Sequence, residues 1–193
     1  MNPMNAVRGA LMVALMATSF QAVAADTKTD TGNTKPATES TQPTATANPG
    51  RIERLVNKIQ KKYGIGADLA RRIVTAAHRT ASIEKLDPIM LLSIIGVESS
   101  FNPNIRNRLG ATGLTQVIPK WHPSKIAEMN RKGGNLFHPE HNIEVGAKIY
   151  SEYLRMSNNN SITALQRYNG SLRDKSRKYS NKVMREYREL STN

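Results

Sequence analysis

The chain has 193 residues, and 28 Lys and Arg against 15 Asp and Glu give it a formal net charge of +13 at pH 7. It contains no cysteine, which excludes disulfide bonds, thiolate metal ligands and lipid attachment to an N-terminal cysteine. Such basicity is typical of proteins that bind polyanions, so nucleic acid, other acidic polymers and membrane surfaces are the partners to weigh.

Residues 1–25 have the pattern of an export signal. Arg8 precedes an apolar run over residues 10–20, and small residues follow up to Ala25. An uncleaved anchor is the alternative, because apolar runs of the two kinds overlap in length. We expect a protein of the periplasm, or a secreted one, which meets acidic envelope polymers and not nucleic acid.

Residues 26–50 are rich in Thr and contain no Val, Ile, Leu or aromatic residue. A segment that cannot bury apolar surface is predicted to be a disordered tether. Residues 51–193 regain apolar periodicity and have the usual length of one domain with a single core.

Apolar residues recur at helical spacing through residues 51–193, and no alternation typical of strands is present, so the predicted fold class is all-α. Asn142 is expected to cap the longest of the later helices. The predicted helices cover approximately 52–63, 68–82, 88–101, 123–129, 142–154, 162–168 and 181–190.

The helix predicted from residue 88 is apolar almost all round, with Asp87 as its N-cap, and it ends before Pro103. Glu98 lies on its buried stripe in the last turn. Burial and the helix dipole both disfavour a negative charge there, so the pKa of Glu98 should be raised, as in a general acid. A buried structural carboxylate and a solvated surface group are the alternatives.

Several short motifs follow in a fixed order after this helix. They are Glu98-Ser99-x-Phe101-Asn-Pro103, Gly113-Leu114-x-Gln116, Asn142 with Gly146 and Tyr153-Leu154, Tyr168-Asn169-Gly170, and Tyr179 with Val183. Together, from about Ala70 onwards, they resemble the soluble lytic transglycosylases. That family has a goose-type, lysozyme-like catalytic domain and cleaves the glycan strands of peptidoglycan.

The resemblance implies that Glu98 is the single acid and base, and that Tyr168 positions it through its hydroxyl. The residues implied to bind substrate or line the cleft are Gln116, Tyr168, Asn169, Ser99, Asn107 and Thr115. Asn107 and Thr115 depart from the usual Ser and Met, and Gly170 directly follows Asn169. Ser99 bonded to backbone and Tyr168 in the core are the structural alternatives, and we expect the lone Trp121 to pack in the core.

The number of available carboxylates distinguishes an ordinary glycosidase from a lytic transglycosylase. Ordinary glycosidases use two carboxylates, but no Asp or Glu occurs between Glu98 and Glu128. A second carboxylate would have to be Glu128, Glu140, Glu144 or Glu152. A one-acid enzyme must use the substrate's own acetamido oxygen and C6 hydroxyl, which gives a 1,6-anhydro product. We therefore expect a lytic transglycosylase, a carbon-oxygen lyase, over a goose-type muramidase that uses water or an inactive peptidoglycan-binding scaffold.

The expected partners are peptidoglycan glycan strands, and the expected state is a monomer. A small domain on a tether is also compatible with an envelope-spanning secretion or conjugation machine. No motif indicates a cofactor, and we expect none. No metal site is expected, because the histidines lack ligand spacing beyond the weak pair His138 and His141.

Overall fold

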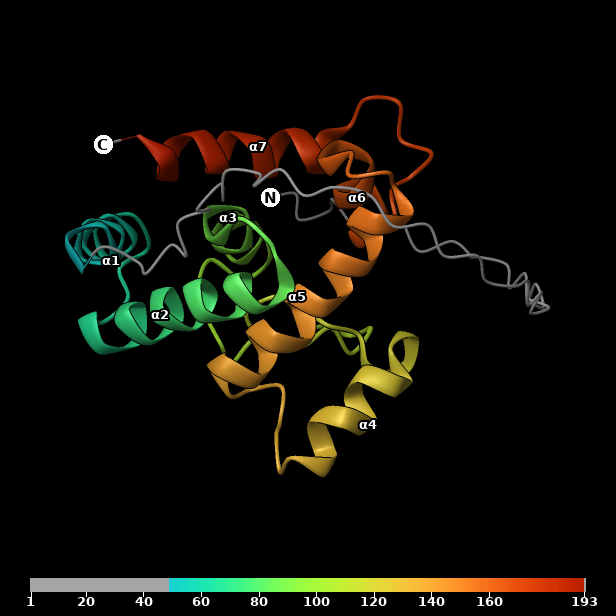
Figure 1. Ribbon diagram of the computed structural model, residues 1–193, viewed down its shortest axis with the longest axis horizontal. Helices are drawn as coiled ribbons and strands as arrows, with labels where there is room; N and C mark the ends of the chain where they lie inside the picture. The colour runs from blue at the N-terminus through green and yellow to red at the C-terminus, as the bar shows by residue number, and fades with distance from the viewer. Residues whose placement is uncertain (1–48, 193) are drawn as a thin grey trace, which may run out of the picture. The chain divides into compact units, whose positions relative to one another are not determined.

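The computed structural model describes residues 49–192. The predicted export signal, and the predicted tether except Pro49 and Gly50, lie outside the described residues. Within residues 49–192 every regular element is a helix, which confirms the all-α prediction (Figure 1). The elements are α1 (Pro49–Tyr63), α2 (Ala67–Glu84), α3 (Pro88–Ser99), the short 3-10 helix η1 (Pro119–Trp121), α4 (Pro123–Arg131), α5 (Pro139–Met156), α6 (Ser161–Tyr168) and α7 (Lys178–Ser191).

Helix α3 is buried between other helices. Asp87 caps it by accepting a hydrogen bond from the Ile89 amide at 2.8 Å, and Pro88 occupies the first turn, where a missing N–H costs nothing. Residues 89–96 are all buried, and α3 packs against α2 on one side and α7 on the other (Figure 1). A helix that is apolar all round is stable only in such a place. The packing fixes the position of the polar residues at its C-terminal end.

Helix α5 packs against α2, α4 and α6. Gly146 of α5 lets the loop at Thr115 approach closely, because a Cβ there would lie 2.4 Å from the Thr115 hydroxyl. No described helix is both long enough and apolar enough to cross a membrane.

Helices α1, α3 and α7 meet at a partly buried polar cluster. The Tyr63 hydroxyl donates a hydrogen bond to Glu186 Oε1 at 2.6 Å, and Lys62 pairs with the other oxygen of the same carboxylate. Gly96 of α3 leaves room for this cluster, since a Cβ at Gly96 would lie 2.6 Å from the Tyr63 hydroxyl. The cluster fixes α7 against α3 two residues before Glu98.

Trp121 is not part of the core, which corrects the sequence prediction. It follows Pro119 in η1, and its side chain is 54% exposed, with Lys120 Nζ 5.5 Å from its ring centroid. The apolar cluster beneath this part of the chain is filled by other residues, namely Val117, Met129, Leu136, Val145 and Ile149.

Candidate active site

Glu98 lies in the last turn of α3, where the chain reverses sharply. Ser100 and Phe101 both have positive φ, of 50° and 63°, which is unusual for two residues other than glycine. Phe101 compensates by burying its ring completely against Tyr63, at a centroid distance of 4.7 Å. Strained backbone of this kind gathers at functional sites.

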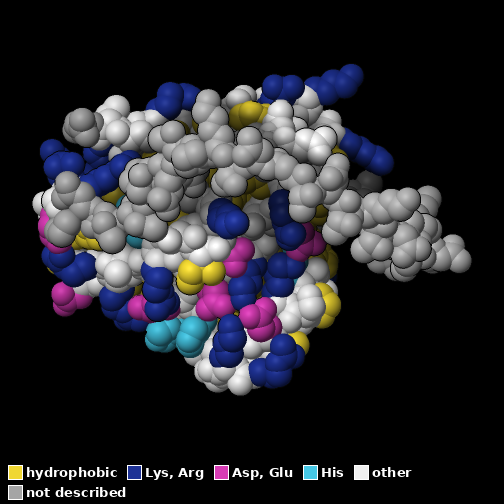
Figure 2. All heavy atoms as spheres, in the orientation of Figure 1, with side chains coloured by type: hydrophobic (Ala, Val, Ile, Leu, Met, Phe, Trp, Pro, Cys, Tyr) yellow, Lys and Arg dark blue, Asp and Glu magenta, His cyan; other side chains and the backbone are white. Residues whose placement is uncertain are grey.

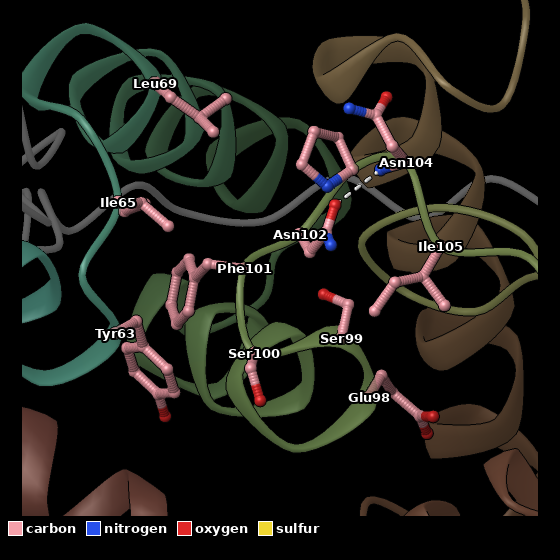
Figure 3. Close-up of a pocket in the computed structure, with 11 residues that line it drawn as sticks. Tyr63, Ile65, Leu69, Glu98, Ser99, Ser100, Phe101, Asn102, Asn104 and Ile105 are labelled. Atoms are coloured by element: carbon pink, nitrogen blue, oxygen red, sulfur yellow. Dashed lines mark hydrogen bonds between the residues drawn. The ribbon is translucent and has the colours of Figure 1, made fainter.

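The reversal opens a cavity of about 550 Å³ between the α1–α2 turn and residues 98–105. Figure 3 shows Tyr63 beside Phe101 on one side of the cavity, and Glu98 at the edge away from Leu69. Glu98 is partly exposed and is the only carboxylate among the residues that line this cavity. A ligand in the cavity would therefore meet a single acid.

Tyr179, in the first turn of α7, donates a hydrogen bond from its hydroxyl to Glu98 Oε1 at 2.7 Å. Burial raises the pKa of Glu98 to about 7, although the Tyr179 hydrogen bond and the charge of Lys182 lower it. The raised pKa agrees with the behaviour predicted from the sequence. A carboxyl with this pKa can both donate and accept a proton near neutral pH.

The carboxylates that could have served as a second catalytic group are all held by cations. Glu128 and Glu144 pair with Lys132 and Lys148, and these contacts lower the pKa of both carboxyls. Glu140 pairs with Arg72 and Glu152 with Lys125. None of the four lines the cavity beside Glu98.

Tyr168 lies near the acid but does not hold it. Its hydroxyl donates to the Thr115 carbonyl at 2.9 Å, while Tyr179 makes the contact with Glu98. Burial, and then the charge of Glu98, raise the pKa of Tyr168. The hydroxyl that reaches the acid is therefore Tyr179 and not Tyr168, because the first turn of α7 lies at the end of α3.

Gln116 lies in a tightly folded loop that is bonded to Asn142 of α5. It has a φ of 50°, is partly exposed, and donates from Nε2 to the Gly113 carbonyl at 2.9 Å. Asn107 organises the same loop, since its Oδ1 accepts from the amides of Leu109 and Ala111. Gln116 is thus held by backbone, and Asn107 shapes the turn that precedes it.

Asn142 is buried inside α5. The prediction that it caps this helix was wrong, because α5 begins at Pro139. Its amide nitrogen donates to the carbonyls of Thr112 and Leu136, and its oxygen accepts from the Thr115 amide and hydroxyl. All the bonds that this amide can make are formed, so Asn142 locks the Gln116 loop to α5. Gly113 is required here, because a Cβ would lie 2.2 Å from Asn142 Nδ2.

The remaining candidate residues separate into inward and outward positions. Thr115 is 2% exposed and faces Asn142, so its side chain is directed away from any bound sugar. The Ser99 hydroxyl is buried and donates to the Ile95 carbonyl at 3.1 Å. Asn169 ends α6, is exposed, and its side chain makes no hydrogen bond to a described residue. Of these three, only Asn169 is free to contact a ligand.

Tyr179 entered the sequence reasoning only as part of a motif with Val183, and no site role was predicted for it. It belongs to the stripe Tyr179, Val183, Glu186 and Leu190, which has the spacing of one helix face, and the last three are buried. A tyrosine at the end of such a stripe presents its polar tip at the rim of the core. That pattern was the available signal. Among the described residues, no three acidic, His or Cys side chains are grouped to hold a metal ion.

The fold and the site define a helical domain that presents one proton-donating carboxylic acid to a cavity. The sequence profile of the transglycosylase SLT domain family matches residues 75–191, which is more than half of the chain. The chain therefore belongs to this family, as its motifs had indicated.

Curated relatives support the assignment over shorter segments. The membrane-bound lytic murein transglycosylase C of Photorhabdus laumondii is 38% identical over 79 residues, 38% of this chain and 22% of that protein. The membrane-bound lytic murein transglycosylase E of Buchnera aphidicola is 34% identical over 77 residues, 37% of this chain and 35% of that protein. The chain thus spans little more than a third of either relative's length at most.

A solved structure agrees with the fold. It is an inactive mutant of the lytic transglycosylase Slt from Pseudomonas aeruginosa, with a TM-score of 0.50 and 22% sequence identity. The match covers 58% of this chain and 23% of that one. At this identity the similarity concerns the helical architecture only.

Proposed function

We propose that this protein is a peptidoglycan lytic transglycosylase. It cleaves the β-1,4 bond between N-acetylmuramic acid and N-acetylglucosamine and leaves a 1,6-anhydro-muramic end. The observation that carries the proposal is Glu98, a lone acid whose pKa is raised to about 7 and which accepts a hydrogen bond from Tyr179. The curated relatives, each named a murein transglycosylase, support the same substrate.

The chemistry follows from having one acid. Protonated Glu98 gives its proton to the glycosidic oxygen, the C1–O bond breaks, and the substrate's 2-acetamido oxygen stabilises the positive charge at C1. The Glu98 carboxylate then removes the proton from the C6 hydroxyl, whose oxygen forms the new bond to C1. The acid ends protonated, as it began, and no water is consumed. Both proton transfers need a Glu98 pKa near the working pH.

The residues around Glu98 have distinct proposed roles. Tyr179 positions the carboxyl and stabilises its charged form. Gln116 and Asn169 are partly or fully exposed and bind the saccharide, while Tyr168 and Asn142 hold the Gln116 loop in place through Thr115. An inward Thr115 acts through this framework and not by contact with sugar.

The setting proposed for this reaction is the cell envelope. The signal-like residues 1–25 support export to the periplasm, where the substrate is found. We further propose that the protein acts there as a monomer and serves an envelope-spanning machine, and the support for the second point is the composition of residues 26–50, which are rich in Thr and contain no Val, Ile, Leu or aromatic residue.

Product analysis tests the proposal. Purified sacculi are digested in heavy-oxygen water and the fragments are identified by mass. The expected muropeptides end in 1,6-anhydro-muramic acid, are ~18 Da lighter than hydrolysed ones by one water, and carry no label. Labelled, reducing products would instead identify a muramidase, and the first residues to test for a second carboxylate would be Glu128 and Glu140. No release of fragments at all would identify a binding or scaffold protein.

A further inference from the structure

The loop before α7 and α7 itself form a strongly basic surface. It consists of seven exposed residues, none of which has an ion pair within the described part of the chain: Arg173, Lys175, Arg177, Lys178, Lys182, Arg185 and Arg188. Figure 2 shows Lys and Arg side chains along the upper edge of the molecule, where Figure 1 draws α7 and this loop. We call these residues the basic surface.

The acids of the same segment do not neutralise it. Glu186 and Glu189 both pair with Lys62 of α1, and Asp174 accepts hydrogen bonds from Ser176 and from the Lys178 amide. Glu189 also interacts with the charges of Arg185 and Arg188, and Asp174 with that of Lys178, but three acids against seven cations leave this segment with an excess of positive charge. The basic surface therefore presents its positive charge outward.

The basic surface adjoins the candidate active site. Tyr179, which directly follows Lys178 of the basic surface, donates a hydrogen bond from its hydroxyl to Glu98 at 2.7 Å. The positive charge of Lys182 also lowers the pKa of the Glu98 carboxyl. A polymer bound across Glu98 has part of its length close to α7. The charge is thus positioned to act on substrate strands.

We propose that the basic surface binds the carboxylates of the peptides carried by peptidoglycan strands, so that the enzyme prefers strands that retain these peptides. The inference rests on the proposed function. The peptides are attached to the muramic acid lactyl group, so their carboxylates project from the glycan beside the bond that is cleaved. One exposed ion pair contributes little, but several on one polymer act together.

An anionic membrane surface fits the same charge less well. Helices that bind membrane surfaces pair a basic face with an apolar face that enters the lipid. Among the described residues of α7, no large apolar side chain is exposed, and Leu172 is the only one in the loop before it. The basic surface therefore has the character of a site for a soluble acidic chain.

The test compares two triple variants with equal loss of charge. The first replaces three residues of the basic surface, Arg173→Gln, Lys175→Gln and Arg185→Gln, and keeps Lys182 because of its effect on Glu98. The matched control replaces three exposed arginines that lie outside the basic surface and have no ion pair with a described residue: Arg79→Gln, Arg131→Gln and Arg155→Gln. Rates are measured on intact strands and on strands whose peptides an amidase has removed.

The wild type should prefer peptide-bearing strands, and the first variant should raise KM for them about tenfold at low salt, with kcat retained. Its KM for stripped strands should match that of the control. Equal KM changes in both triple variants, or on both kinds of strand, would overturn the inference. So would a loss of binding to phosphatidylglycerol vesicles with unchanged KM for strands, because that result identifies a lipid surface.

A binding measurement separates this inference from the proposed function. The Glu98→Gln variant, with and without the three substitutions, is sedimented with intact and with amidase-treated sacculi. Binding should depend on the basic surface only when peptides are present. If the wild type cleaves neither strand but this dependence is seen, the proposed activity fails and the inference stands. Cleavage of both strands with peptide-independent binding refutes only the inference.

Discussion

Two glutamates in this domain accept a hydrogen bond from a tyrosine, yet their surroundings differ. Glu98 accepts from Tyr179 at 2.7 Å, and Glu186 accepts from Tyr63 at 2.6 Å. Only Glu186 is also in contact with a cation, Lys62. Burial without a paired cation raises the pKa of Glu98 to about 7. Glu186 is thus held in an ion pair with Lys62, whereas Glu98 has no ion pair among the described residues and its raised pKa suits proton transfer.

Helix α7 carries one partner of each pair. Tyr179 reaches the end of α3, and Glu186, two turns later on the same face, bonds Tyr63 beside Gly96. The structural pair thus holds the helix that supplies the tyrosine of the catalytic pair. Changes at the two glutamates should consequently affect different properties, activity at one and stability at the other.

The largest expected effect is on turnover. Glu98→Gln keeps the shape and hydrogen-bonding capacity of the side chain but removes the transferable proton, so the cleavage rate of sacculi should fall on the order of 10²-fold or more. The circular dichroism spectrum should be unchanged. The control is Glu189→Gln on the exposed side of α7, which should keep the wild-type rate. A fully active Glu98→Gln protein would remove Glu98 from the mechanism.

The second effect is on stability. Glu186→Ala leaves the Tyr63 hydroxyl without its acceptor beside a buried helix, and should lower the free energy of unfolding by about 2 kcal/mol in urea titrations. Glu189→Ala removes an acid that pairs with the same Lys62 but is 51% exposed. It should change the stability by less than about 0.5 kcal/mol. Equal losses would show that burial does not distinguish the two acids.

The third effect is the pH dependence of stability. The folded-state pKa of Glu98, about 7, exceeds its ordinary value of 4.5, so the folded state binds this proton more tightly. The stability that results is complete below pH 4.5 and is lost as the pH rises through 7. Relative to the wild type, Glu98→Gln should therefore gain about 3 kcal/mol between the two ends of this range. A constant difference between the two proteins across this range would contradict the raised pKa.

The smallest effect separates the two tyrosines near the acid. The Tyr179 hydrogen bond lowers the pKa of Glu98, so Tyr179→Phe should raise that pKa. The alkaline limb of the pH–rate profile should move upward by about one unit. Tyr168→Phe is the matched control, because its hydroxyl donates to the Thr115 carbonyl and not to the acid. Its alkaline limb should stay in place, and a shift of equal size in both variants would argue against a specific role for Tyr179.

The sequence by itself determined the helices and the place of the acid. Both depend on local patterns: apolar residues at helical spacing, Asp87 and Pro88 at the start of α3, and a carboxyl on a stripe that must be buried. These patterns need no knowledge of what the helix packs against. The raised pKa of Glu98 followed from the same reasoning, since burial alone accounts for its direction.

Only the tertiary structure decided which side chains act on that acid. Asn142 was predicted to cap a helix because asparagine is a common N-cap residue. Its side chain instead makes four hydrogen bonds, to Thr112, Thr115 and Leu136. Tyr179 is 81 residues from Glu98 along the chain and reaches it because α7 packs on α3. Contacts between distant segments depend on how helices pack, and the spacing of residues within one helix does not specify them.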